Sequence, residues 1–265
     1  MNAEPILPRL VVEDLVAGYD DTPVLNGIGL SVDAGEIVAV LGATGSGKST
    51  LLRCIVALLR PEQGRVLIGG RNVHGERDER DEILRGVGLA FQDAALLNSM
   101  TTAENVALPI IEHWGADEET ALMLARMRLA RVGLGRAGDK MPSELSGGMR
   151  KRAGIARAIA LDPALLLLDE PSAGLDPTTA RAIDELILDL RAQTDMAIVA
   201  VTHEVASIDT IADRAVMLAD GRMIASGTLA EVHASTDPRV QAFFERRLVD
   251  DGARGGLVGE LEWKT

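Results

Sequence analysis

Glycines crowd one short segment of this 265-residue chain. The segment is Gly42-Ala43-Thr44-Gly45-Ser46-Gly47-Lys48-Ser49, which fits the pattern G-x-x-x-x-G-K-S/T at every fixed position. An apolar run at residues 36–41 predicts a short buried strand before it, and residues 49–59 predict a helix after it. Because glycines let backbone N–H groups turn inward at the start of a helix, this order predicts a phosphate-binding loop.

The polar side chains of this loop predict what it holds. Lys48 is expected to reach the terminal phosphates of a nucleotide, and the Ser49 hydroxyl is expected to hold Mg²⁺. The predicted nucleotide-binding residues of the loop are Gly42, Ala43, Thr44, Gly45, Ser46, Gly47, Lys48, Ser49 and Thr50. A glycine-rich turn without a ligand is the alternative, and the predicted strand and helix on either side make it the weaker one.

A second signal lies where the leucine run 165–168 leads directly into Asp169 and Glu170. An uninterrupted apolar run is typical of a central parallel strand, and two acids after it would be costly if they were simply buried. A carboxylate at such a strand end can hold Mg²⁺, which we assign to Asp169. The next carboxylate can polarise a water for attack on a γ-phosphate, which we assign to Glu170.

The remaining segments predict a mixed fold. Residues 8–34 read as two strands around a turn, which favours antiparallel pairing. Residues 93–158 carry Ala, Leu and Met at helical spacing and predict a helical insert, in which Met123 and Met127 are expected to belong to the core. Strands and helices that alternate around the glycine loop predict an α/β P-loop NTPase core with a parallel sheet, whose ligand lies at the carboxyl ends of the strands.

Composition limits the classes of function. The net charge of −13 argues against a nucleic-acid partner. The single cysteine, Cys54, excludes a disulfide framework and a cysteine-rich zinc site, and its place in the predicted helix suggests a buried thiol. No apolar stretch approaches the ~18 residues of a membrane span, and the N-terminus lacks the pattern of a signal peptide. We therefore expect a cytoplasmic chain whose membrane role, if any, comes through a partner.

Further motifs carry a resemblance to one family. The segment Leu145-Ser146-Gly147-Gly148-Met149-Arg150-Lys151-Arg152 resembles the signature motif of ATP-binding-cassette (ABC) ATPases. Other elements of that family follow in its order: Tyr19 for the aromatic that stacks on adenine, Gln92 for the Q-loop, 172–176 for the D-loop and His203 for the switch histidine. Tyr19 is the only tyrosine, and a plain surface position is its alternative. The resemblance covers about residues 8–246, and motifs in the right order are more specific than any single one.

The resemblance implies an ATPase with ATP and Mg²⁺ as cofactors. The implied catalytic residues are Glu170 as general base, His203, Gln92 and Lys48, and the implied metal ligands are Ser49, Gln92 and Asp169. In the family, the segment Ser146, Gly147 and Gly148 faces the ATP of the opposite subunit, and Asp176 joins the two sites. A head-to-tail homodimer is therefore implied, with residues 1–246 as the nucleotide-binding domain and 247–265 as a C-terminal extension.

One departure points to a subfamily. Met149 stands where many ABC ATPases have glutamine, and this form resembles the ATPase subunit of Mla/Mce-type lipid transporters. Residues 91–97 and 236–240, with Phe243 and Phe244 following, resemble that subfamily as well. The likeness implies transmembrane permease subunits, an Mce-domain lipid-binding protein and, in some members, a STAS-domain regulator. It also implies a place on the inner face of the cell membrane.

Several alternatives stay open. The nearest is an ABC ATPase subunit for an amino acid, a metal or a lipoprotein, because the ATPase does not line the translocation path. A non-transport ABC ATPase for DNA repair, chromosome organisation or translation typically has coiled coils, zinc cysteines or two cassettes, none of which this sequence has. A switch GTPase would need the sequence Asn-Lys-x-Asp, which is absent. The tail after residue 246 is either a flexible extension or a segment that docks through Leu257, Val258, Leu261 and Trp263.

Overall fold

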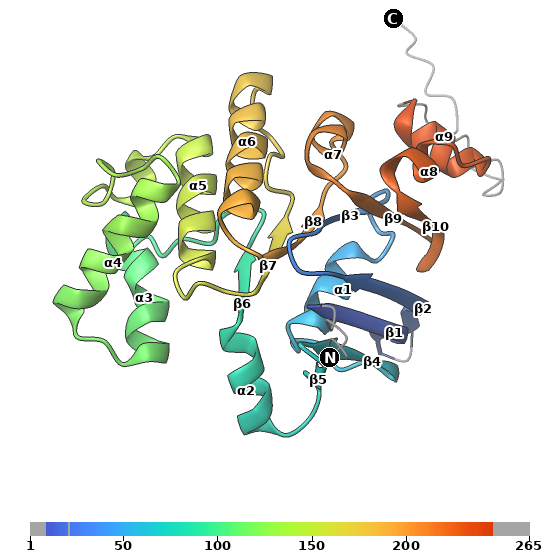
Figure 1. The fold of residues 1–265 in the computed structure, drawn as a ribbon, viewed down its shortest axis with the longest axis horizontal. Helices are drawn as coiled ribbons and strands as arrows, with labels where there is room; N and C mark the ends of the chain where they lie inside the picture. Colours follow the sequence, from blue (N-terminus) through green and yellow to red (C-terminus); the bar gives the residue numbers. More distant parts are fainter. Residues whose placement is uncertain (1–8, 21, 246–265) are drawn as a thin grey trace, which may run out of the picture.

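A computed structural model describes residues 9–20 and 22–245, and the predicted C-terminal extension at 247–265 lies outside them. Figure 1 shows two sheets with a group of helices beside them. The first sheet is antiparallel, in the order β2-β1-β4-β5. Its strands are β1 (Leu10–Tyr19), β2 (Thr22–Val32), β4 (Gln63–Ile68) and β5 (Arg71–Asn72). The antiparallel N-terminal part of the predicted fold is therefore confirmed.

The second sheet has the order β10-β9-β3-β8-β7-β6, and only its edge strand β10 runs antiparallel. Its strands are β3 (Ile37–Leu41), β6 (Val87–Ala90), β7 (Leu165–Asp169), β8 (Ala197–Val201), β9 (Arg214–Ala219) and β10 (Arg222–Thr228). Every residue of β3 and β8 is buried, because other elements cover both faces of the sheet. Continuous apolar runs thus mark central strands here, as the sequence predicts.

Alternate residues of the central strands face two different layers. Val38 and Val40 pack with α1 (Lys48–Ile55) and the antiparallel sheet, in one hydrophobic cluster. Ala39 and Leu41 face the other side, in a cluster with buried residues of α7 (Val205–Ile211), α8 (Leu229–His233) and α9 (Pro238–Phe244). The remaining helices of the sheet domain are α2 (Arg77–Arg85) and α6 (Pro177–Gln193). No helix among 9–20 and 22–245 is long and apolar enough to cross a membrane.

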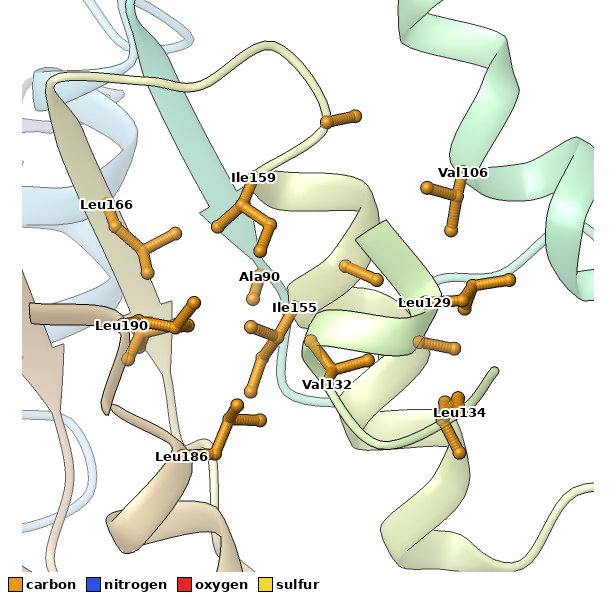
Figure 2. Packing of buried hydrophobic residues seen from close by; sticks show 14 of the residues in the cluster. Ala90, Val106, Leu129, Val132, Leu134, Ile155, Ile159, Leu166, Leu186 and Leu190 are labelled. Carbon is orange, nitrogen blue, oxygen red and sulfur yellow. The ribbon is translucent and has the colours of Figure 1, made fainter. Parts of the chain in front are cut away.

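Between β6 and β7 the chain forms only helices over the described stretch 91–164. These are α3 (Thr102–Trp114), α4 (Glu118–Arg131), a 3₁₀ turn at Pro142–Glu144 and α5 (Gly147–Ala158). Figure 2 shows Val106 of α3, Leu129 of α4 and Ile155 of α5 in one apolar cluster with Leu186 of α6. We call these elements the helical segment. Its packing on α6 joins it to the sheet through buried side chains.

The expectation that Met123 and Met127 belong to the core is wrong. Both side chains are 57% exposed. The buried face of α4 consists of Ala121, Ala125 and Leu129, which are four residues apart and lie on one side of the helix. The methionines lie two residues away from these positions, on the opposite side. Ala121, Ala125 and Leu129 share one buried cluster with apolar residues of α3.

Candidate functional site

The glycine loop connects β3 to α1 with a backbone that only glycine adopts easily. Gly42, Gly45 and Gly47 have φ angles of +148°, +83° and +107°. A Cβ atom on Gly42 would lie 2.4 Å from the carbonyl oxygen of Leu218, so a side chain there would clash. Gly47 caps α1 without a side-chain hydrogen bond, which leaves N–H groups at the helix N-terminus for a ligand. This geometry suits an anion at the start of the helix.

Lys48 lies across this loop. Its Nζ donates hydrogen bonds of 2.7 and 2.9 Å to the carbonyl oxygens of Gly42 and Ala43. Burial lowers the pKa of its ammonium group, and the charges of the nearby carboxylates Glu170 and Asp169 offset only part of this decrease. The ammonium group therefore lies between the loop and two acids, where a phosphate would neutralise it.

A cleft of about 570 Å³ opens over the loop at the carboxyl ends of the parallel strands. It brings together predicted residues that are far apart in the sequence: Gly42, Ala43, Thr44, Gly45, Gly47, Lys48, Ser49, Thr50, Gln92, Asp169, Glu170 and His203. Val24, Val201 and Phe243 also line it. None of these three is a predicted site residue. Only the fold brings them to the cleft.

The two acids differ in their surroundings. Asp169 ends β7, and burial, together with the charge of Glu170, raises its pKa. Glu170 is only 8% exposed, and its Oε1 accepts a 2.8 Å hydrogen bond from Nδ1 of His203. Its other oxygen, Oε2, is buried without a hydrogen-bond partner among the described residues. Glu170 therefore has one oxygen held by His203 and one oxygen without a hydrogen-bond partner.

The backbone at Glu170 is held in an uncommon conformation. Its φ is +49°, in the left-handed region that costs a non-glycine residue about 1–3 kcal/mol. The amide of Glu170 donates to the Val201 carbonyl at 2.8 Å, and Nζ of Lys151 donates to the Glu170 carbonyl at 2.6 Å. Strand β8 and helix α5 thus fix the residue from two sides. The strained backbone aims the Glu170 side chain into the cleft.

The donor set of the cleft fits Mg²⁺. Ser49, Gln92 and Asp169 offer a hydroxyl, an amide and a carboxylate oxygen, which are the ligand types that Mg²⁺ takes. Among the described residues, no group of three or more His, Cys, Asp and Glu side chains could hold a metal ion by itself. A magnesium ion here would need phosphate oxygens to complete its shell, as nucleotide sites provide.

The other predicted residues lie outside this cleft. Ser146 caps α5, its Oγ accepting from the Met149 amide at 3.3 Å, and Asp176 caps α6 by accepting from the amides of Thr178 and Thr179 at 3.1 Å. A Cβ on Gly148 would lie 2.4 Å from Cγ2 of Thr179, so the signature segment packs tightly on α6. A Cβ on Gly147 would lie 3.4 Å from Cδ2 of Leu175, so this glycine lies against the D-loop. The signature segment and the D-loop therefore form one surface, apart from the loop of the same chain.

Tyr19 and Ser46 also lie apart from the lining of the cleft. Tyr19 ends β1 and is 40% exposed. Its hydroxyl accepts a 2.7 Å hydrogen bond from Arg53, whose guanidinium lies 5.9 Å from the ring centroid. Ser46, within the glycine loop, is buried, and its Oγ has no hydrogen-bond partner in the described part of the chain.

Comparisons with known proteins agree with this geometry. The sequence profile of the ABC transporter family matches residues 25–173. The probable ribonucleotide transport ATP-binding protein Mkl of Mycobacterium tuberculosis is 37% identical over 98% of this chain and 71% of that protein. The intermembrane phospholipid transport ATP-binding protein MlaF of Haemophilus influenzae is 40% identical over 88% of this chain and 89% of its own.

Two further likenesses widen this comparison. The methionine import ATP-binding protein MetN of Mesorhizobium japonicum is 42% identical over 90% of this chain and 64% of that protein. The dimeric ATP-binding cassette MJ0796, solved in a post-hydrolysis state with ADP and Pi, superimposes with a TM-score of 0.76 at 31% identity. That superposition covers 83% of this chain and 98% of the other. The P-loop α/β fold with its helical segment is thus confirmed, and the chain belongs to the ABC transporter family of ATP-binding proteins.

Proposed function

We propose that this chain is the ATP-hydrolysing subunit of an ABC transporter that moves phospholipid or another lipid between membranes. The observation that carries the ATPase part is the cleft itself. One space holds the glycine loop with Lys48, the acids Asp169 and Glu170, and His203 hydrogen-bonded to Glu170 at 2.8 Å.

In this proposal each residue has one task. The loop N–H groups and Lys48 hold the phosphates of ATP, and Glu170 takes the proton of the attacking water with its unpartnered Oε2. His203 keeps Glu170 in place and contacts the γ-phosphate. Bound Mg²⁺, held by Ser49, Gln92 and Asp169, would neutralise phosphate charge. Positioning and charge stabilisation supply nearly all of the catalysis in phosphoryl transfer.

A homodimer would complete the site. Ser146, Gly147, Gly148 and Asp176 lie outside the cleft of their own chain, and the N-terminus of α5 beside them suits a phosphate. The similar cassette MJ0796 was solved as a dimer with ADP and Pi. We therefore assign these residues to the ATP of a second copy of this chain. Tyr19 would stack on adenine.

A second hollow, of about 480 Å³, suggests where a permease docks. It lies between β6 and α3, and Leu89, Phe91 and Leu108 are among the residues that line it. Phe91 is 43% exposed and directly precedes Gln92, which lines the ATP cleft. A permease segment in this hollow would touch Phe91, the neighbour of the proposed Mg²⁺ ligand Gln92. The chain would then lie on the inner face of the cell membrane.

Lipid is the proposed cargo because of the form of the signature and because of MlaF. Met149 and residues 91–97 resemble the Mla/Mce subfamily, and MlaF proteins are 39–40% identical to this chain. An Mce-domain protein and a STAS-domain regulator would be further partners. The likenesses to MetN and Mkl keep amino acids and other cargo as the alternative.

The affinity for ATP tests the proposed nucleotide site. Lys48→Ala should weaken ATP binding about 10- to 100-fold, because it removes charged hydrogen bonds to phosphate. Lys140→Ala, at an exposed position of the helical segment, serves as control and should bind ATP normally. Equal ATP affinity in both variants would contradict the nucleotide site.

The cargo needs a separate experiment. The chain is purified from native membranes by affinity, and mass spectrometry identifies the proteins and lipids that come with it. A permease, an Mce-domain protein and phospholipid would support lipid transport. A permease with a different substrate-binding partner would replace lipid by that cargo and leave the ATPase untouched.

A further inference from the structure

A second contact joins the two catalytic segments behind the cleft. It consists of Ser172, Ser207 and Asp184, whose exposed fractions are 3%, 4% and 4%. Ser172 comes two residues after Glu170, and Ser207 comes four residues after His203. Asp184 lies in the middle of α6. The front contact, between Glu170 and His203, faces the cleft, whereas this back contact is closed to solvent.

The hydrogen bonds of the back contact have a direction. Oγ of Ser207 donates to Oδ2 of Asp184 at 2.9 Å, and the Oγ atoms of Ser172 and Ser207 lie 3.1 Å apart. A serine has one O–H proton, so Ser207 has none left for Ser172. Ser172 must therefore donate to Ser207. Asp184 is the acceptor at the end of the chain and orders both hydroxyls.

Stability does not explain a carboxyl group at this place. Oδ1 of Asp184 is buried and has no hydrogen-bond partner among the described residues. Burial raises the pKa of this group, and the hydrogen bond from Ser207 offsets only part of that rise. A half-satisfied buried carboxyl weakens the fold relative to an apolar side chain of similar size. The role of Asp184 therefore lies in the geometry that it imposes on Ser207 and Ser172.

We propose that Asp184 is a positioning residue for ATP hydrolysis: through Ser207 and Ser172 it fixes the segment after Glu170 to the helix after His203. This proposal rests on the proposed ATPase function. We call the back contact of Ser172, Ser207 and Asp184 the clamp. It keeps Glu170 and His203 at their hydrogen-bonding distance, and it holds residues 171–176 where Asp176 can face a second subunit. Asp184 touches neither ATP nor the reacting water.

The test uses the full chain and four variants. Asp184→Ala and Ser207→Ala remove the clamp. Asp184→Asn keeps an oxygen that accepts from Ser207 and replaces the already unpartnered Oδ1. Asp189→Ala makes the same change as Asp184→Ala at an exposed position of the same helix, and it is the matched control. For each variant, kcat and KM for ATP hydrolysis and the affinity for ATP are measured.

The expected result separates positioning from binding. Asp184→Ala and Ser207→Ala should lower kcat about tenfold or more, because small misplacements of catalytic groups are expensive in rate. Their ATP affinity should stay within about threefold of the wild type, because the glycine loop is untouched. Asp184→Asn and Asp189→Ala should retain most of kcat. Unchanged kcat in Asp184→Ala, parallel losses in kcat and ATP affinity, or an Asp184→Asn variant as slow as Asp184→Ala would each overturn the proposal.

Amide hydrogen exchange gives a readout that needs no turnover. In Asp184→Ala and Ser207→Ala, peptides over 170–176 and 203–207 should exchange faster than in the wild type and in Asp189→Ala. Equal exchange would refute the clamp even if the chain hydrolysed no ATP. A wild-type chain without ATP binding would instead refute the proposed function, so the two failures are distinguishable.

Discussion

The cleft over the glycine loop and the helical segment differ in how they satisfy buried polar atoms. In the helical segment, Asn105 is fully buried, and its side chain uses every hydrogen-bonding group that it has. Its Oδ1 accepts from the Leu97 amide at 2.7 Å, and the two N–H groups of Nδ2 are shared among the carbonyl oxygens of Leu97, Met100 and Thr101 at 2.9–3.2 Å. Over 91–164, all of it described, no buried side-chain nitrogen or oxygen lacks a partner.

The cleft shows the reverse. Oε2 of Glu170, which lines the cleft, is buried without a partner within the described residues, and Glu170 has a left-handed backbone. Oγ of Ser46, in the glycine loop beside the cleft, is likewise buried without a partner there. Such features lower stability, and they persist where function needs a group that the fold leaves free. The helical segment is thus built for satisfied packing, whereas the cleft keeps hydrogen-bonding capacity for a ligand.

The two regions meet at a strained junction. Gln92 lines the cleft, and Ala94 and Ala95 follow it with φ angles of +59° and +48°. Arg157 of α5 donates to their carbonyl oxygens at 2.8 and 2.7 Å. The helical segment therefore holds this turn from its own side. These two hydrogen bonds connect the turn after Gln92 to α5.

The largest effect is expected in the cleft. Glu170→Gln should lower ATP turnover by about 10²–10⁴-fold, because an amide cannot accept the proton of the attacking water. ATP binding should be retained, since the loop and Lys48 are unchanged. Steady-state hydrolysis and equilibrium ATP binding are measured on the same preparation. Rapid hydrolysis by this variant would show that another group is the base.

The helical segment should respond in stability and not in binding. Asn105→Leu should lower the free energy of unfolding by about 2–4 kcal/mol, because it leaves the Leu97 amide and the Met100 carbonyl oxygen without this partner. The carbonyl oxygens of Leu97 and Thr101 keep backbone donors. Asn98→Ala, at an exposed position nearby, should change it by less than about 0.5 kcal/mol. Denaturant unfolding and ATP affinity are the readouts. A loss of ATP affinity without a loss of stability would erase the distinction between the two regions.

Local sequence patterns predicted the parts of the fold that depend on local physics. The apolar run at 165–168 and the glycine loop before Lys48 depend on neighbours in the chain, and both predict their elements. The structure places the loop, Asp169 and His203 in one cleft, while their roles stay predictions. The clamp at Asp184 could not be predicted, because it needs the register of α6 against α7.

The same reasoning explains why Phe243 escaped notice as a lining residue. It belongs to the short helix α9, which is far from the loop in sequence and reaches the cleft by packing under β3 and β9. Phe243 belongs to a stretch that resembles the Mla/Mce subfamily, but that resemblance gives it no role in the cleft. Its position follows from the path of the chain after β10, which a single sequence does not encode in any one motif.

The smallest effect is expected at the exposed methionines of α4, and it tests which face of this helix is buried in solution. Met127→Gln should change the free energy of unfolding by less than about 0.5 kcal/mol, because the side chain is 57% exposed. Leu129→Ala on the same helix should cost about 2–5 kcal/mol, since Leu129 is fully buried. Denaturant unfolding of both variants, with the slope checked for two-state behaviour, makes the comparison. Equal losses of unfolding free energy in the two variants would mean that α4 buries its methionines in solution, contrary to the exposed position of Met127 in the structure.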